Sequence, residues 1–183
     1  MTPLATVEEL AAYSKGQIGA DDPRAFLTLN GVSAAIRRYC GWHVVPEQDD
    51  VLTVDGPGGR LLSLPTLNLV SVASVVEDGI ALAPTDYRWS SDGSVVKNGY
   101  WSPDFRSIVA TIKHGYDFDD AADVVGVALA VATRQLSSPT GATREQAGQV
   151  SVSWAVTAPG VSGGIALLAH ERDVLDHFRV VTV

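Results

Sequence analysis

A serine in the stretch Gly-Val-Ser-Gly-Gly, residues 160–164, has the surroundings that come nearest to a catalytic motif. The stretch matches the Gly-x-Ser-x-Gly pattern of hydrolases, in which Ser162 would attack a carbonyl carbon. That chemistry needs a histidine and an acid on later loops. The later His170, Asp173 and His177 instead fall on one expected helix that leads away from Ser162. We therefore expect a flexible turn here and keep a small serine hydrolase using Ser162 as the less favoured alternative.

Metal and cofactor sites are not supported by the residues that could form them. The aspartates between Asp117 and Asp123 lack the central glycine and closing glutamate of a calcium loop, so helix capping explains them better. His170 and His177 are seven residues apart, whereas zinc-binding pairs usually use a spacing of four. The glycine-rich Asp55–Arg60 opens no helix that could hold a phosphate. We expect no cofactor, no metal and no catalytic residue.

Composition limits the function classes further. The chain has 183 residues, of which 46% are hydrophobic and 19% are charged, as expected for one folded domain spanning residues 1–183. Its net charge of −8 argues against a broad contact with nucleic acid, which needs clustered lysine and arginine. The single cysteine, Cys40, excludes an intrachain disulfide. No apolar run is long enough to span a bilayer and the N-terminus does not resemble a signal peptide, so we expect no membrane contact.

Helical patterns lie at both ends of the chain. Thr6 with Glu9 matches a capping box and predicts a short helix that ends near Tyr13. A second helix is expected from Pro23 to Cys40, because apolar residues recur there at helical spacing. These residues are Phe26, Leu29, Val32, Ile36 and Tyr39. We expect them to pack on a central buried helix over Ala121–Leu136, with a last helix over about Ile165–Phe178.

Residues 42–113 show the pattern of strands and turns. Three Asp-Gly pairs, at positions 55–56, 78–79 and 92–93, each predict a hairpin. The expected strands are Val51–Val54, Arg60–Leu64, Leu69–Val76, Ile80–Ala83, Tyr87–Trp89, Ser94–Val96 and Ile108–Lys113. His43 and His114 lie beside Trp42 and Tyr116 at the two ends of this region, and we interpret them as packing residues. The fold class is therefore α+β: a small helical bundle with an inserted antiparallel β-hairpin region.

A strand pattern over residues 149–156 follows an expected extended loop, residues 137–148. A strand held on a loop leaves its backbone donors and acceptors unpaired unless another edge meets it. We expect that edge to come at least partly from a neighbouring subunit, with Trp154 as the anchor. The expected subunit interface consists of Arg144, Gln149, Val150, Val152 and Trp154.

The tail, residues 179–183, is rich in β-branched residues. One possibility is an edge strand in the protein's own sheet. The other is addition to a strand edge on a partner, in which backbone hydrogen bonds supply the affinity. The expected partner-contacting residues are Arg179, Val180, Val181 and Val183.

The order of several segments resembles a known family. "IRRYCGWHVVP", "DGPGGRLLSLPTLNLVSVASVVEDG", "VATIKHGYD" and "LLAHERDVLDHFR" follow one another between about Ala34 and Arg179. This order resembles the head-to-tail adaptor (connector) proteins of tailed phages with actinobacterial hosts. The resemblance implies a structural virion protein and no enzyme.

Such adaptors form a ring, commonly of twelve copies, beneath the portal, where the ring joins the capsid to the tail and continues the DNA channel. The implied partners are further copies of the chain, the portal protein and a downstream head-completion or tail protein, with DNA passing without sequence-specific binding. The portal is then the partner expected for residues 179–183. The implied location is the capsid–tail junction of the virion, after assembly in the host cytoplasm. A head-completion stopper or a tail-terminator ring is the alternative, and it should have more strands and fewer flanking helices.

Overall fold

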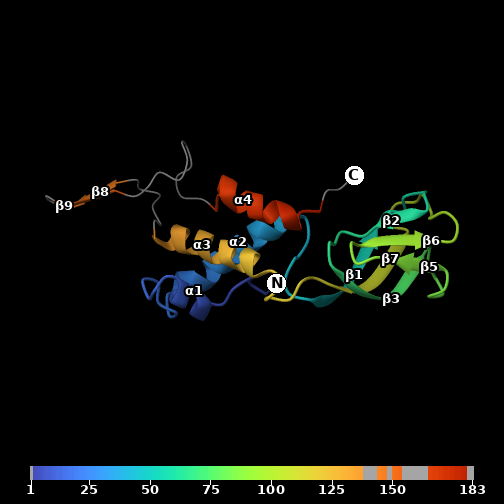
Figure 1. Ribbon diagram of the computed structural model, residues 1–183, viewed down its shortest axis with the longest axis horizontal. Coiled ribbons are helices and arrows are strands. Elements are labelled where there is room, and N and C mark those ends of the chain that lie inside the picture. The colour runs from blue at the N-terminus through green and yellow to red at the C-terminus, as the bar shows by residue number, and fades with distance from the viewer. Residues whose placement is uncertain (1, 138–143, 148–149, 154–164, 181–183) are drawn as a thin grey trace. The chain divides into compact units, whose positions relative to one another are not determined.

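The computed structural model describes residues 2–137, 144–147, 150–153 and 165–180, with only the backbone described for residues 144–147 and 150–153. Two compact units make up the chain (Figure 1). The helical unit combines Met1–Tyr39 with Ala122–His177, and the strand unit combines Cys40–Ala121 with Phe178–Val183. The chain therefore passes between the units three times.

In its described residues, the helical unit contains four α-helices (Figure 1). They are α1 (Val7–Tyr13), α2 (Pro23–Cys40), α3 (Ala122–Ser137) and α4 (Ala169–Leu175), and a 3-10 turn, η1 (Asp176–Phe178), follows α4. Both α1 and α4 contact α3. The expected capping box is confirmed at the start of α1, where Thr6 and Glu9 exchange side-chain to backbone hydrogen bonds of 3.1 and 2.7 Å.

The buried face of α2 begins one residue earlier than the sequence pattern predicted. Ala25, Leu29, Val32 and Ile36 are fully buried, whereas Phe26 is 58% exposed, so its expected place in the core is wrong. Successive helical residues are turned by about 100° from one another, and Ala25 already occupies the position one turn before Leu29. Phe26 is therefore turned off the buried face.

The expected central helix is confirmed as α3, which buries residues on several of its faces. These are Val124, Val127, Ala128, Leu129, Val131, Ala132 and Leu136. By contrast, α4 begins at Ala169 rather than near Ile165. The Leu168 N–H donates to the Glu171 carboxylate at 2.7 Å, which satisfies a backbone donor at the start of this helix.

Two antiparallel sheets build the strand unit. The first has the order β1-β7-β3-β4 and consists of β1 (Gln48–Val54), β7 (Ile108–His114), β3 (Leu69–Glu77) and β4 (Ile80–Ala81). The second has the order β2-β6-β5 and consists of β2 (Leu61–Ser63), β6 (Ser94–Lys97) and β5 (Tyr87–Trp89). The α+β fold class predicted from the sequence is confirmed.

Two of the three expected hairpins are present. Asp78 and Gly79 join β3 to β4 with φ angles of 50° and 79°, as a tight turn with two left-handed residues requires. Asp92-Gly93 lies between β5 and β6, which also pair. Asp55-Gly56 does not form a hairpin, because β1 pairs along its length with β7 and β2 pairs with β6 in the other sheet.

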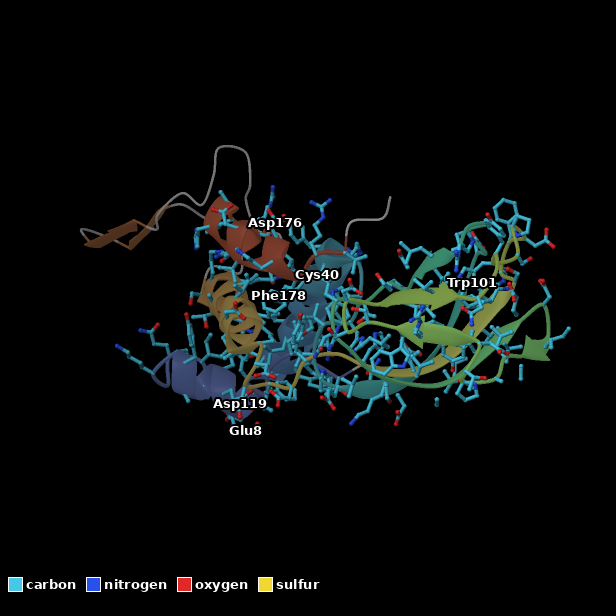
Figure 2. The ribbon with its side chains drawn as sticks, turned by 45° about the vertical axis from the view of Figure 1, so that its right-hand side comes forward. Glu8, Cys40, Trp101, Asp119, Asp176 and Phe178 are labelled. Atoms are coloured by element: carbon cyan, nitrogen blue, oxygen red, sulfur yellow. The ribbon has the colours of Figure 1, made fainter. Side chains whose placement is uncertain are left out.

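The core of the strand unit draws on both sheets. Trp101, from the loop between β6 and β7, is 1% exposed and lies among the strands (Figure 2). The other members are Leu62, Leu64, Leu69, Val75, Tyr87, Val95, Ile108, Ala110 and Ile112. Each large apolar side chain buried in this way contributes about 1.5–3 kcal/mol of transfer free energy.

A separate two-stranded sheet lies between α3 and α4 in sequence. It pairs β8 (Arg144–Ala147) with β9 (Val150–Ser153) in antiparallel register, from Arg144↔Ser153 to Ala147↔Val150. Residues 144–147 are thus a strand where the sequence predicted part of an extended loop. Only two residues separate the strands in sequence, so β8 is the partner for β9 with the smallest loop-closure cost.

Candidate interaction surfaces

No metal-binding cluster is present in the part of the chain that the structure describes. Its histidine, cysteine and acidic side chains form no group of three that could hold a metal ion. The Asp117 carboxylate accepts the N–H groups of Asp119 and Asp120 at 3.0 and 2.9 Å, which fits the expected capping role. Ser162 lies outside the described residues. No helix within the described ranges has the length and apolar character of a membrane span.

Five aromatic or imidazole rings lie close together in the strand unit. They come from residues 42–43, near the point where the chain enters the unit, from residues 114 and 116, before it leaves, and from residue 178, where it enters again. We call Trp42, His43, His114, Tyr116 and Phe178 the junction cluster. Its ring centroids are separated by 4.2 Å for His43–His114, 5.8 Å for Trp42–Tyr116 and 5.5 Å for Tyr116–Phe178. The expectation that both histidines are packing residues is consistent with these contacts.

Hydrogen bonds tie the same three segments together. The Trp42 indole N–H donates to the Phe178 carbonyl at 2.7 Å, and the Val180 N–H donates to the Cys40 carbonyl at 2.9 Å. Gly115 is required here because its φ is +111° and an added Cβ would lie 2.5 Å from His43 Nε2. The junction cluster therefore fixes residues that are distant in sequence within one unit.

His114 is the most unusual titratable group of the junction cluster. It is 2% exposed, and neither ring nitrogen has a hydrogen-bond partner among the described residues. Burial and the neighbouring His43 lower the pKa of His114 to about 4, against an opposing contribution from Asp50, whose Oδ2 lies 3.7 Å from Nε2. The imidazole is consequently neutral at pH 7 and packs as an aromatic ring.

An ion pair joins α3 to α4, the two helices that precede and follow β8 and β9 in sequence. Arg134, near the end of α3, contacts both carboxylate oxygens of Glu171 on α4 at 2.6 and 3.1 Å, and it also donates to the Ala166 carbonyl at 2.9 Å. Glu171 is buried. Burial alone would raise its pKa, but the hydrogen bonds from Arg134 and from the Leu168 N–H hold the pKa below its usual value. This arrangement fixes the two ends of the intervening segment to each other.

The hairpin of β8 and β9 contains three of the five residues expected at a subunit interface. Arg144, Val150 and Val152 lie on its strands, while Gln149 and Trp154 lie outside the described residues. In the described structure these two strands pair only with each other. Each strand thus has one edge without a strand partner in that part of the chain, and an isolated two-stranded hairpin is marginally stable in water.

The expected partner-contacting tail is described only as far as Val180. Arg179 is exposed, and Val180 is half-buried and held by its bond to Cys40. Val181 and Val183 lie outside the described residues. Neither Arg179 nor Val180 is in a strand.

Sequence reasoning did not identify the Arg134–Glu171 pair or the role of Phe178 in the junction cluster. Both depend on contacts between residues far apart in the chain. The sequence did contain one indication of the role of Glu171. An acidic residue at the third position of a helix commonly accepts a hydrogen bond from the backbone N–H of the residue before the helix.

Comparisons with known proteins connect this fold to assembled particles. A chain from the neck of an empty gene transfer agent (GTA) particle, computed with C6 symmetry, has a TM-score of 0.59 and 16% identity, over 98% of this chain and 91% of that one. A chain from the neck of a native GTA particle, computed with C12 symmetry, has a TM-score of 0.58 and 14% identity, over 100% and 94%. The chain therefore shares the fold of these neck chains over nearly its whole length. No protein-family model and no curated protein matches the sequence.

Proposed function

We propose that this chain is a structural protein of the neck of a phage-like particle, at the capsid–tail junction, where it acts as a ring-forming head-to-tail adaptor rather than as an enzyme. The observation that carries the proposal is the fold shared with two neck chains across 98% and 100% of this chain. Those necks have C6 and C12 symmetry. Their symmetry supports a ring, and the sequence resemblance supports twelve copies and a particle with an actinobacterial host.

The adaptor role is favoured over a stopper or tail terminator by the helical content. The described residues include four helices in a unit of their own, whereas a stopper or terminator is expected to have more strands and fewer flanking helices. The three chain passages between units also support a strand region inserted into a helical unit, as the adaptor resemblance implies.

The proposed ring contact uses the hairpin of β8 and β9. Its outer strand edges have no strand partner among the described residues and would pair with a neighbouring subunit, and the Arg134–Glu171 pair fixes its base. In a ring each subunit gives one such edge and receives another, so the exchange closes. Trp154, beyond β9 in sequence, is the proposed anchor, together with Arg144, Gln149, Val150 and Val152.

The proposed portal contact uses the tail. Residues 179–183 add to a strand edge of the portal, with Val180, Val181 and Val183 choosing the pocket side and Arg179 at the rim. The hydrogen bond from the Val180 N–H to the Cys40 carbonyl holds the start of the tail in place, which supports this proposal. A downstream head-completion or tail protein would bind the ring elsewhere.

The charge of the chain suits a channel for DNA. At −8 for each subunit, a ring would surround the DNA with a surface that does not bind phosphate. DNA would then pass without sequence-specific contacts, in a particle assembled in the host cytoplasm.

Native mass spectrometry of the purified chain, alone and mixed with portal, combined with cryo-electron microscopy of particles, tests the proposal. We expect a ring, density for this chain beneath the portal, and loss of the ring in Trp154→Ala with little change in monomer melting temperature. A monomeric protein with esterase turnover that disappears in Ser162→Ala would support the hydrolase alternative instead.

A further inference from the structure

At one end of the strand unit, loops connect the strands, and none of the three chain passages to the helical unit lies there. Val54 and Glu77 both pair with Ile108, at the opposite end of the strands from His114. We call this the distal end. It consists of residues 55–60, 78–79, 83–86 and 98–107, which the hydrogen bonds Asn98 N–H to Asp86 carbonyl and Trp101 N–H to Gly59 carbonyl bring together.

Two aromatic side chains of the distal end are directed away from the core. Tyr100 is 73% exposed and Phe105 is 86% exposed, while Trp101 between them in sequence is buried. Ile80, at the β3–β4 turn of the same end, is also exposed. Two large exposed aromatic side chains carried by one loop are typical of protein contact sites.

The backbone that carries these aromatic residues is held by hydrogen bonds from several directions. The Gly56 N–H donates to the Asp104 carbonyl at 2.9 Å, and the Arg106 N–H donates to Asp55 Oδ1 at 2.7 Å. A Cβ on Gly56 would lie 1.8 Å from the Ser102 carbonyl oxygen, so only glycine allows this approach.

An ion pair with low solvent exposure, between Glu77 of β3 and Lys97 of β6, also holds the loop of residues 98–107. Lys97 Nζ lies 2.7 Å from Glu77 Oε1, and the Ser102 N–H donates to the same oxygen at 2.8 Å. Lys97 also lies 4.9 Å from the centre of the Trp101 ring. The exposed aromatic residues are thus attached to a backbone that is already ordered, which lowers the entropy lost when a partner binds.

The charges around these residues indicate the chemistry of the partner. Exposed acidic residues outnumber exposed basic ones at the distal end: Asp55, Asp78, Asp86 and Asp104 against Arg60 and Arg106. A nucleic acid would be repelled by this end, and so would the same acidic end of a second copy.

We propose that the distal end is a preformed docking surface for a different protein of the neck, whose receiving surface is an apolar pocket bordered by lysine or arginine side chains. Tyr100 and Phe105 enter the pocket, and the aspartates face its basic border. This inference rests on the proposed function, because it assumes that the chain is part of a neck.

Photo-crosslinking in assembled particles tests the partner class. Phe105 is replaced by p-benzoyl-phenylalanine, and Phe118, an exposed phenylalanine beyond β7, receives the same replacement as the matched control. We expect position 105, and not position 118, to crosslink to a non-identical protein at a peptide that contains lysine or arginine. Crosslinks to another copy of this chain, to DNA, or to nothing overturn the inference.

Binding of the crosslinked protein, purified and measured by biolayer interferometry, gives the second readout. We expect Tyr100→Ser/Phe105→Ser to weaken binding by about thirtyfold or more and Phe118→Ser to change it by less than about twofold. Asp104→Lys should slow association about threefold or more at low salt. Equal losses in the aromatic and control variants overturn the inference.

The two proposals fail differently. Particles that contain the chain at the neck, but in which position 105 crosslinks only to its own copies, overturn the docking surface and leave the proposed function intact. Particles whose necks lack the chain overturn both.

Discussion

The two ends of the strand unit use the same residue types in opposite ways. At the junction cluster, Trp42 and Tyr116 contact other rings of the same chain, and the Trp42 N–H has a carbonyl partner. At the distal end, Tyr100 and Phe105 remain exposed although their backbone is equally well held. The difference indicates that aromatic residues stabilise the fold at one end and are available to a partner at the other. Substitutions at the two ends should therefore separate stability from assembly.

Trp42→Ala should have the largest effect on stability. The substitution leaves a cavity beside three rings and removes the donor to the Phe178 carbonyl, so we expect a loss of about 3–5 kcal/mol in the free energy of unfolding. Urea denaturation measures it. Trp89→Ala, which removes a more exposed tryptophan from β5, is the matched control and should cost about 0.5 kcal/mol. Similar losses in both variants would show that the ring contacts of Trp42 do not stabilise the junction end more than an ordinary exposed tryptophan does.

Acid should weaken the junction end through His114. Its pKa is about 4 in the folded chain and about 6.5 when unfolded, so the unfolded chain binds the additional proton between these values. Stability from the neutral ring is complete above pH 6.5 and falls as the pH drops towards 4, by about 3 kcal/mol in total.

His114→Phe keeps an aromatic ring and removes this titration. We expect its melting temperature to fall less steeply than that of the unchanged protein between pH 6.5 and 4. Parallel pH profiles for the two proteins would show that other groups, rather than His114, cause the acid sensitivity.

Gly56→Ala should disturb the distal end moderately. The new Cβ would overlap the Ser102 carbonyl, so the loop must shift at a cost of about 1–3 kcal/mol. Gly59→Ala is the control, because no atom lies within 4 Å of a Cβ at that position. Thermal melting compares the two variants. Equal melting temperatures would show that the loop is not held as tightly as its hydrogen bonds indicate.

Tyr100→Ser/Phe105→Ser should have the smallest effect on stability. Both side chains are exposed, so we expect a change within about 0.5 kcal/mol by urea denaturation. A loss comparable to that of Trp42→Ala would place these side chains in the fold itself and remove the contrast between the ends.

Local sequence signals predicted the parts of the fold that depend on neighbouring residues. The capping box of Thr6 and Glu9 and the Asp78-Gly79 turn are each specified within a few positions, and both are present. The Asp55-Gly56 turn was misread because the choice between a hairpin and a passage to another sheet depends on β7, far along the chain. Phe26 was misplaced because α2 offers two adjacent apolar positions, and tertiary packing chose Ala25.

The interaction surfaces were less predictable. Tyr100, Trp101 and Phe105 belong to one residue class, and their different exposures arise from contacts with Asp55, Gly59 and Glu77, which precede them by many positions. The pairing of β9 with β8 was likewise missed, since residues 144–147 have a polar sequence that lacks a strand pattern. The interface assignments at Trp154 and Val183 remain predictions.

The position of Phe178 in the junction cluster also has a consequence for synthesis on the ribosome. The strand unit begins at Cys40, but the carbonyl partner of Trp42 and the ring that meets Tyr116 are made only after residues 122–177 have been translated. In the nascent chain, Trp42 therefore lacks that partner until the second half of the helical unit has been translated. A chain interrupted before Phe178 would expose this aromatic surface to chaperones and proteases, so incomplete subunits could be removed before they join an assembly.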